Sequence, residues 1–208
     1  MNPDEITLKV REIFYTLQGE GARAGQASIF IRLAMCNKEC WFCDTDWSFG
    51  RVHTLAKIAE RINKYPCEWI VWTGGEPTIQ LTDAVVDYFR ELGYRQAIET
   101  NGTNPVPKDI DYIACSPKVT PEVLWHNFEM TGVDEYRFPV NNLEIEKQVP
   151  RTRDIPPAKY YYLSPLFLGE KKQMFAYQKE TVAKCVAYIK EHPEWSLSVQ
   201  QHKLWGIP

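Results

Sequence analysis

Residues 36–43 read Cys-Asn-Lys-Glu-Cys-Trp-Phe-Cys and follow an apolar run that ends at Ala34. These residues carry three thiols, spaced Cys-x3-Cys-x2-Cys, which a tight loop can point at one centre. Structural zinc sites are closed by four protein ligands, and iron–sulfur clusters usually take four cysteines. No fourth cysteine follows nearby, so Cys36, Cys40 and Cys43 predict a metal centre that keeps one coordination position open.

Two other interpretations of these cysteines stay open on spacing alone. His53 would complete a zinc knuckle as a fourth ligand, or the three thiols would be unrelated buried side chains. The remaining cysteines, Cys67, Cys115 and Cys185, lie in or beside apolar stretches. We expect them to be core residues, because free cysteine is often buried.

Composition indicates one globular domain that spans residues 1–208. Hydrophobic residues make up 44% and aromatic residues 13% of the chain, which is enough to bury a core. A net charge of −3 gives no reason to expect a nucleic-acid or membrane partner, and the apolar runs are too short to cross a bilayer. Residues 1–5 are polar and acidic, unlike a secretory signal, so we expect a cytoplasmic protein whose thiols stay reduced.

The apolar pattern alternates between strands and helices, as in parallel βα units. We expect strands at 9–17, 28–34, 68–73, 96–100, 112–115, 135–140, 159–163 and 196–200, and helices at 55–64, 82–92 and 173–191. Residues 119–134 are irregular, and the connection from Cys115 to Tyr136 is too short for an ordinary long crossover helix. The predicted fold class is α/β, an abbreviated and incomplete (β/α) barrel.

Polar and glycine-rich segments follow the predicted strands, at the edge where α/β sheets bind ligands. Residues 18–21 (Gln-Gly-Glu-Gly) follow the first strand, Arg32 lies near the end of the second, and residues 73–77 (Thr-Gly-Gly-Glu-Pro) end the third. Glycine lets the backbone approach a bound group, and Glu76 can accept a hydrogen bond from an ammonium group. An ordinary strand–helix turn is the alternative for residues 73–77.

The cysteine spacing, the aromatic Phe42 and the later Gly-Gly-Glu-Pro segment together resemble the radical S-adenosylmethionine (SAM) enzymes. A narrower resemblance, from about Val10 to Pro208, is to the 7-carboxy-7-deazaguanine synthase family. It rests on segments that occur in the same order, namely 14–21, Arg32, 44–45, 99–103, 116–118 and 201–208. The fold expected from this resemblance is an incomplete barrel of the radical SAM type.

The resemblance also implies an activity. The family is a group of radical SAM lyases that contract 6-carboxy-5,6,7,8-tetrahydropterin to 7-carboxy-7-deazaguanine with loss of ammonia, on the way to queuosine. The implied cofactors are a [4Fe-4S] cluster, SAM and Mg²⁺. The implied partners are a second copy of the chain, forming a homodimer, and an electron donor such as flavodoxin or ferredoxin. No protein residue is expected to be catalytic beyond this cofactor chemistry.

Roles for individual residues follow from the same resemblance. Cys36, Cys40 and Cys43 would hold the cluster, and the Thr45 hydroxyl would bind Mg²⁺, with a plain turn hydroxyl as its alternative. The SAM site would include Phe42, Cys43, Asp44, Gly75, Glu76, Ser116, Pro117 and Lys118. The pterin site would include Leu17, Gln18, Gly19, Arg32, Thr73, His202 and the terminal carboxylate of Pro208.

Several alternatives remain beside these roles. Arg32 suits a substrate carboxylate because the planar guanidinium can bind a carboxylate bidentately, and a surface ion pair is its alternative. For His202 the alternative is a structural histidine. The chain has Ser-Pro-Leu-Phe at 164–167 where many relatives carry Gln-Pro. The family's side-chain contacts in that loop therefore cannot be assigned to this chain. Two other functions fit parts of the pattern: an activating enzyme that makes a glycyl radical on a partner protein, and a zinc-stabilised binding module.

Overall fold

The computed structural model describes residues 2–141, 144–167 and 179–208, and in these ranges nine strands form one sheet. The strands are β1 (Thr7–Leu17), β2 (Ala27–Leu33), β3 (Arg51–Thr54), β4 (Trp69–Gly74), β5 (Arg95–Thr100), β6 (Tyr112–Cys115), β7 (Val133–Val140), β8 (Ala158–Pro165) and β9 (Trp195–Leu197). Their order in the sheet is β3-β1-β2-β4-β5-β6-β7-β8-β9. β1 is antiparallel to both of its neighbours, and every pair from β2 to β9 is parallel.

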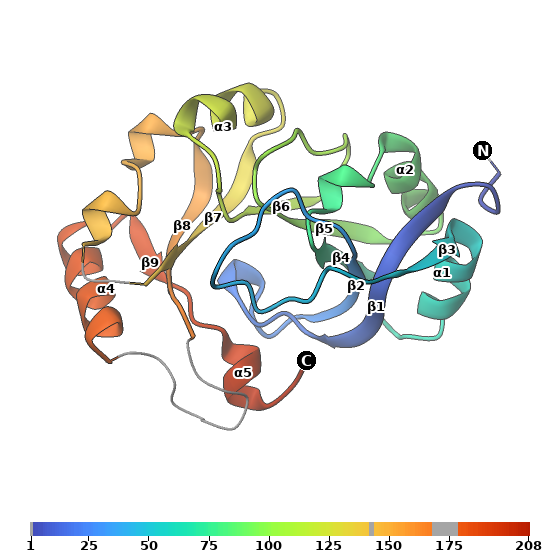
Figure 1. Ribbon diagram of the computed structural model, residues 1–208, viewed down its shortest axis with the longest axis horizontal. Helices are drawn as coiled ribbons and strands as arrows, with labels where there is room; N and C mark the ends of the chain where they lie inside the picture. Colours follow the sequence, from blue (N-terminus) through green and yellow to red (C-terminus); the bar gives the residue numbers. More distant parts are fainter. Residues whose placement is uncertain (1, 142–143, 168–178) are drawn as a thin grey trace.

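The sheet is curved but open, with β3 and β9 at opposite ends of the strand order. The helices are α1 (Leu55–Ile62), α2 (Asp83–Glu91), α3 (Pro121–Phe128), α4 (Lys179–Glu191) and α5 (Gln201–Trp205), with 3-10 turns η1 (Gly21–Arg23), η2 (Pro77–Ile79), η3 (Ile145–Lys147) and η4 (Thr152–Asp154). Helices α1 to α4 lie around the outside of the sheet, and α5 lies at its open side with the C-terminus (Figure 1). The expected α/β fold with an incomplete barrel is confirmed.

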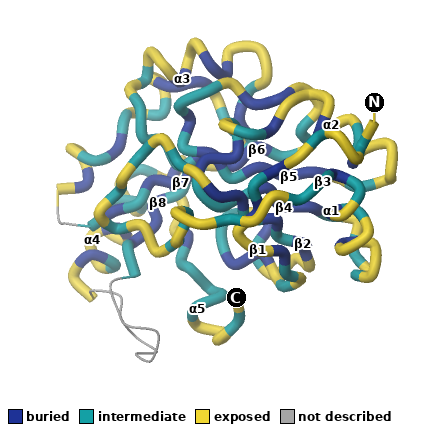
Figure 2. Tube along the Cα trace, turned by 45° about the vertical axis from the view of Figure 1, so that its right-hand side comes forward, coloured by how far each residue is buried: buried dark blue, intermediate teal, exposed yellow. Residues whose placement is uncertain are grey.

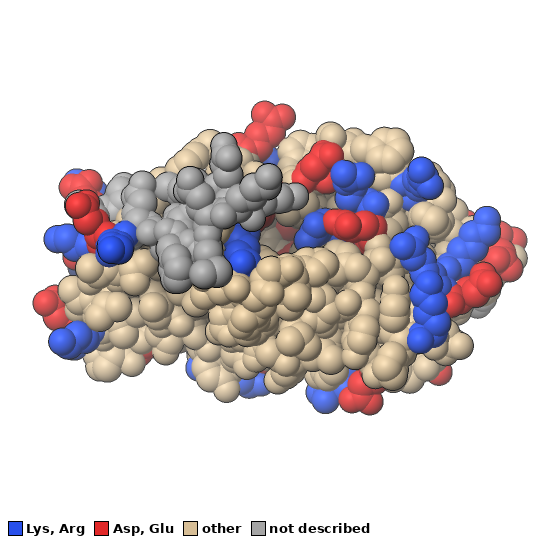
Figure 3. Space-filling model, turned by 90° about the horizontal axis from the view of Figure 1, so that it is seen from below, with Lys and Arg blue, Asp and Glu red and all other residues tan. Residues whose placement is uncertain are grey.

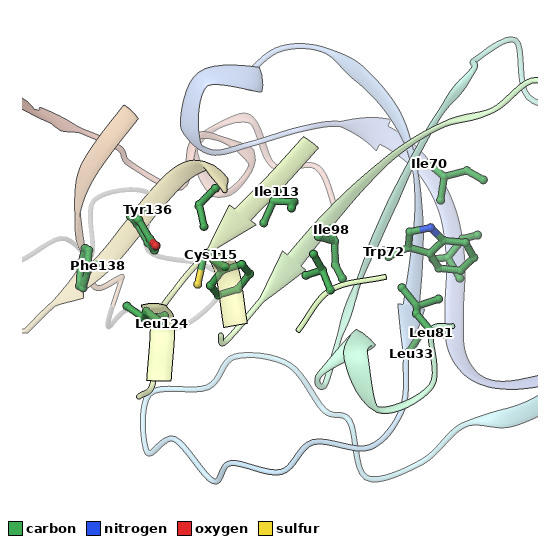
Figure 4. Close-up of a cluster of buried hydrophobic side chains, with 14 of the residues drawn as sticks. Leu33, Ile70, Trp72, Leu81, Ile98, Ile113, Cys115, Leu124, Tyr136 and Phe138 are labelled. Carbon is green, nitrogen blue, oxygen red and sulfur yellow. The ribbon is translucent and has the colours of Figure 1, made fainter. Parts of the chain in front are cut away.

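The hydrophobic core lies along the central strands. Ile70, Val71 and Trp72 of β4 are completely buried, as expected for an apolar strand that is covered on both faces. The Trp72 indole packs edge-on against Phe89 of α2, with ring centroids 5.3 Å apart, and its Nε1 donates to Gln96 Oε1 at 2.9 Å. The buried layer continues through Leu33, Ile98, Ile113, Cys115, Tyr136 and Phe138 (Figure 4). Figure 2 shows that the outer helices alternate buried and exposed positions around this layer.

Local sequence signals explain how the elements begin and end. Thr54 ends β3 and caps α1, because its hydroxyl oxygen accepts a hydrogen bond from the Lys57 N–H at 3.3 Å. Leu55, Ile58 and Ile62 form the buried face of α1. Gly93 follows α2 with a φ of +88°, the left-handed conformation in which glycine ends many helices.

The structure corrects part of the expectation for the connection between Cys115 and Tyr136. Residues 119–134, expected to be irregular, hold the helix α3, but this helix has only eight residues, so the connection contains no long crossover helix, as expected. Pro121 is at the start of α3, where its missing N–H costs no hydrogen bond. Leu124 and Phe128 lie one turn apart and are both buried, so even this short helix covers part of the sheet.

Two further elements, β3 and α5, were not predicted. β3 pairs with Thr7–Val10 of β1 at the edge of the sheet, where a short strand leaves little apolar signal. Residues 173–178 of the expected last long helix lie outside the described residues, and its described part is α4. Cys115 and Cys185 are buried as expected, and Cys67 is half-buried against the core. None of the described helices is both long and apolar enough to cross a membrane.

Candidate active site

A cavity of about 970 Å³ lies where the strand ends meet the C-terminal segment. All seven residues predicted to surround the pterin line it: Leu17, Gln18, Gly19, Arg32, Thr73, His202 and Pro208. They come from β1 and its following loop, from β2, from β4, and from α5 and the residues after it. Figure 3 shows this side of the molecule, with a hollow near its centre and both acidic and basic side chains around it.

The loop after β1 is shaped by Gln18 and held against α5. Gln18 Oε1 accepts hydrogen bonds from the Gly19 and Glu20 N–H groups at 2.8 and 3.3 Å, and Gln18 Nε2 donates to Glu99. The Gly19 carbonyl accepts from the Gln201 N–H at 2.9 Å. A Cβ atom on Gly19 would lie 2.2 Å from His202 Nδ1 and 2.7 Å from His202 Cβ, so only glycine lets α5 pack this closely.

His202 reaches the cavity from α5. Burial lowers the pKa of His202 below its ordinary value, despite the opposing influence of Glu20 and Asp44. The imidazole is therefore neutral at pH 7 and offers one donor and one acceptor nitrogen. The geometry thus puts His202 at the cavity, although its role toward a ligand stays a prediction.

The structure shows both features that the sequence suggested for Arg32, an ion pair and a position in the cavity wall. Its Nη1 lies 2.6 Å from Glu12 Oε1 in an ion pair, and its guanidinium lies over the Phe14 ring at 5.2 Å. Its Nε is buried without a hydrogen-bond partner among the described residues, and the side chain lines the cavity. Buried donors are normally satisfied, so this nitrogen fits an acceptor supplied by a ligand.

The three cysteines of residues 36–43 share one loop after β2. Cys36 and Cys40 are half-buried and Cys43 is exposed, and the Cys43 N–H donates to the Cys40 carbonyl at 3.0 Å. Burial raises the pKa of the Cys36 thiol, and Glu76 and the other two thiols add to the effect. In the described part of the chain no three His, Cys, Asp or Glu side chains already converge on a metal position. Three thiols in one loop are a donor set that fits a cluster with one open position, and the binding of a cluster by Cys36, Cys40 and Cys43 stays a prediction.

His53 does not complete this group. It lies on β3 and lines a separate cavity of about 220 Å³ together with Arg11, Arg51 and Arg61. Burial lowers the pKa of His53, and Arg61, Lys57 and Arg51 lower it further. Such positive surroundings oppose a bound cation, so the structure disfavours the zinc knuckle.

The Gly-Gly-Glu-Pro segment packs directly on the start of the cysteine loop. The Gly75 N–H donates to the Leu33 carbonyl at 2.9 Å and the Glu76 N–H to the Met35 carbonyl at 2.8 Å. A Cβ atom on Gly75 would lie 1.8 Å from the Met35 carbonyl oxygen, and Gly74 has a φ of +119°. Both glycines are therefore required for the close approach of these two loops.

Glu76 lies beneath this segment and is not a cavity-lining residue. It is 0% exposed, and its Oε1 accepts from the Thr78 hydroxyl at 2.7 Å, the Thr78 N–H at 3.1 Å and the Thr100 hydroxyl at 2.8 Å. Its Oε2 accepts from the Asn101 N–H at 2.7 Å. These bonds tie the end of β4 to the end of β5. A direct contact between Glu76 and SAM stays a prediction.

We expect Glu76→Gln to lower the free energy of unfolding by about 3 kcal/mol, or roughly 6–12 °C in Tm. Either orientation of the glutamine amide turns an NH₂ group toward a backbone N–H, of Thr78 or of Asn101. Thermal unfolding followed by circular dichroism measures the change. The exposed Glu60 of α1 supplies the matched control, Glu60→Gln, and equal Tm values for the two variants would contradict the role given to Glu76.

The other residues predicted for SAM lie beside the cavity. Lys118 Nζ donates to the Ser116 carbonyl and hydroxyl oxygens at 2.9 and 3.0 Å and lies 5.5 Å from the centre of the Phe42 ring. Asp44 Oδ2 lies 2.6 Å from Lys203 Nζ, which joins the cysteine loop to α5. Asp44, Thr45 and Ser116 line the cavity, whereas Phe42, Gly75, Pro117 and Lys118 are set back from its lining.

Comparison with known proteins identifies the family. The model of the radical SAM superfamily matches residues 31–124. A 7-carboxy-7-deazaguanine synthase of Bacteroides thetaiotaomicron is 36% identical over 199 residues, which cover 96% of this chain and 98% of that protein. The chain belongs to the 7-carboxy-7-deazaguanine synthase family. The protein of the same name from Neisseria meningitidis is 36% identical over 210 residues, covering 99% of this chain and 96% of that protein.

A solved structure supports the fold assignment of this 7-carboxy-7-deazaguanine synthase family member. The crystal structure of QueE from Escherichia coli matches with a TM-score of 0.71 at 23% identity and covers 96% of both chains. Membership in the radical SAM superfamily makes the chain an enzyme that uses a [4Fe-4S] cluster and SAM. This membership sets aside the zinc-stabilised binding module, and the nearly full-length matches to 7-carboxy-7-deazaguanine synthases set aside the glycyl-radical activating enzyme.

The sequence reasoning assigned no role to several cavity residues of this 7-carboxy-7-deazaguanine synthase family member. Glu20, Glu99 and Arg137 line the cavity, and Arg137 lies in the middle of β7. One signal was available in the sequence. Glu135 and Arg137 are two residues apart in an otherwise mostly apolar strand, so they share a face and pair there.

Proposed function

We propose that this enzyme converts 6-carboxy-5,6,7,8-tetrahydropterin to 7-carboxy-7-deazaguanine with release of ammonia, in queuosine biosynthesis. The names of the relatives support the reaction. The structural observation that carries it is the convergence of all seven predicted pterin residues, from four separate segments, on one cavity. We also propose that residues 1–208 are a single radical SAM domain that works as a cytoplasmic homodimer with flavodoxin or ferredoxin as electron donor.

The side chains of the cavity suit a pterin that carries a carboxylate. The unpaired Nε of Arg32 and its neighbouring Nη groups present donors for the substrate carboxylate, while Glu12 holds one of them in place. Neutral His202 would lie beside the pterin ring on the side of α5. The loop at Gln18 and Gly19, whose conformation is held by the Gln18 side-chain amide, would lie on the same side. Phe14 and Phe30 stack in parallel, with ring centroids 5.3 Å apart, and add an apolar wall. Together these groups orient the substrate and limit the access of water.

The cofactor side of the proposal uses the residues around the cysteine loop. Cys36, Cys40 and Cys43 would hold the cluster, and Phe42, Asp44, Gly75, Glu76, Ser116, Pro117 and Lys118 would surround SAM. When bound, the cluster and SAM supply one-electron hydrogen-abstraction chemistry, which no protein side chain provides. Burial lowers the pKa of Lys118 below its ordinary value, and the nearby thiols of Cys40, Cys115 and Cys43 oppose this shift.

We further propose that Thr45 binds Mg²⁺ at the cavity wall, where its side chain is half-buried. A hydroxyl, substrate oxygens and water suit a hard octahedral cation. Thr45→Val keeps the shape of the side chain and removes the hydroxyl, so the Mg²⁺ concentration for half-maximal activity should rise about 10-fold. Thr131→Val, on an exposed loop, is the control. An unchanged Mg²⁺ titration in Thr45→Val would contradict this role.

Anaerobic reconstitution tests the proposed function as a whole. The wild-type protein is loaded with iron and sulfide and incubated with the carboxytetrahydropterin, SAM, Mg²⁺ and a chemical reductant. We expect formation of 7-carboxy-7-deazaguanine, identified by mass, with one ammonia released per product. A brown protein with a bound cluster that leaves the pterin unchanged would reject the substrate, and a colourless protein would reject the cofactor as well.

A further inference from the structure

Four ionisable side chains from three separate segments meet at the wall of the cavity. Arg137 of β7 is only 6% exposed, and its Nη1 lies 2.9 Å from Glu20 Oε2. Its Nη2 pairs with Glu99 Oε2 at the end of β5. Its Nε lies 3.0 Å from Glu135 Oε1, without the alignment of a hydrogen bond. One guanidinium therefore serves three carboxylates.

Each carboxylate of this cluster is also held from a second side. Glu99 Oε1 accepts from Gln18 Nε2 and Glu20 Oε1 accepts from Gln200 Nε2, both at 2.9 Å. Glu135 Oε2 accepts from the Ala22 N–H and the Tyr112 hydroxyl, both at 2.8 Å. Each carboxylate thus contacts Arg137 and also accepts a hydrogen bond from another group. Few other rotamers keep both contacts, so these contacts fix the orientation of each carboxylate.

Glu135 is the most deeply buried carboxylate of the cluster. It is 2% exposed, and a Cβ atom on Gly21 would lie 2.0 Å from its Oε1, so glycine is needed where the loop after β1 crosses it. Burial raises the pKa of Glu135, while the Ala22 N–H, the Tyr112 hydroxyl and the charge of Arg23 lower it. Glu135 does not line the cavity; its contact with Arg137 holds the guanidinium in the wall.

Glu20 and Glu99 differ from Glu135 because they line the cavity, with side chains that are 19% and 22% exposed. An ionised carboxylate has about four acceptor positions, and the protein contacts occupy only some of them. The acceptors that remain can face N–H donors in the cavity. The aminopyrimidinone edge of a pterin carries such donors.

We propose that Arg137 is a positioning residue that acts through Glu20 and Glu99 and thereby sets the affinity and orientation of the pterin ring. This inference rests on the proposed function. Without the guanidinium, three carboxylates would lie close together in a largely buried place, and at least one would protonate or turn away. The acceptors offered to the ring would then be lost or misdirected.

The test compares Arg137→Gln and Arg137→Lys with the wild-type holoenzyme. Arg137→Gln should raise both the KM for the carboxytetrahydropterin and the dissociation constant of the fluorescent analogue 6-carboxypterin about 10- to 100-fold, with a smaller change in kcat. Arg137→Lys keeps the charge but cannot reach three carboxylates, so its effect should be intermediate. Arg90→Gln, at an exposed ion pair with Asp109 on the outer surface, is the control and should change neither constant.

A double-mutant cycle separates positioning from plain structural support. If Arg137 acts through Glu99, then adding Arg137→Gln to Glu99→Gln should cost much less than it costs in the wild type. Fully additive losses would overturn the inference. So would a fall in Tm and kcat with no change in KM or in the affinity for 6-carboxypterin. If Arg137→Gln does not fold, the same comparison with Arg137→Lys decides.

The two proposals fail in different ways. A wild-type holoenzyme that makes no 7-carboxy-7-deazaguanine rejects the proposed function and this inference with it. A wild-type enzyme that makes the product, together with Arg137 variants that bind 6-carboxypterin normally, rejects this inference alone.

Discussion

Replacing any one of Cys36, Cys40 and Cys43 by alanine is expected to abolish product formation. The reason lies in the number of ligands, because residues 36–43 carry three thiols and the proposed cluster uses all of them. A cluster held by two protein thiolates would be lost or labile. Iron and sulfide analysis of the anaerobically reconstituted variants, together with product formation, measures the effect.

Cys67→Ser provides the matched control for these variants. Cys67 is also a half-buried free cysteine, but its Sγ contacts Ala27 and Trp69, the first residues of β2 and β4, whereas the cysteine loop follows the other end of β2. We expect normal iron content and turnover in Cys67→Ser. Normal iron content in any of the three alanine variants would refute the assignment of the cluster to this loop.

Arg32→Lys is expected to lower kcat/KM for the carboxytetrahydropterin about 10- to 100-fold, mainly through KM. Lysine carries one compact ammonium group, so it cannot hold Glu12 and a substrate carboxylate at the same time with fork geometry. It also removes the Nε that is buried without a partner at the cavity. Steady-state kinetics with the holoenzyme measures the effect.

Glu12→Gln distinguishes the two possible roles of Arg32. Glu12 is half exposed, and pairs of this kind contribute only about 0–1 kcal/mol. If Arg32 binds the substrate carboxylate, Glu12→Gln should change KM by a small factor while Arg32→Lys changes it strongly. Similar effects of the two substitutions, confined to Tm, would show that Arg32 serves only as a surface ion pair.

The sequence was informative wherever a local pattern determined the structure. The apolar run at β4 predicted a strand that is buried on both faces, and Thr54 predicted the start of α1. Motifs at strand ends predicted the cavity residues, because the carboxyl ends of parallel strands lie at the same edge of a sheet in any strand order. α3 escaped detection since only two of its residues, Leu124 and Phe128, carry the helical apolar spacing to the core.

Long-range polar contacts could not be predicted in this way. Glu76 was interpreted as a candidate ligand of an ammonium group, but its four hydrogen bonds depend on how β4 and β5 are placed. The spacing of Arg137 could have indicated its pairing with Glu135 on the same strand, but nothing in the sequence indicated its pairing with Glu20 and Glu99, which come from other parts of the chain. A single sequence shows which residues are charged, and the fold decides which of them meet.

The hydrogen bonds that close the cavity have a consequence for how the protein is made. They join Glu20 to Gln200, Gly21 to Ser198 and Asp44 to Lys203, which are 180, 177 and 159 positions apart. Contacts between such distant residues form late, because the entropy of closing so long a loop must be overcome first. A nascent chain therefore presents its three thiols on the ribosome long before the opposite wall exists. Ligand affinity should accordingly appear only in the last kinetic phase of refolding.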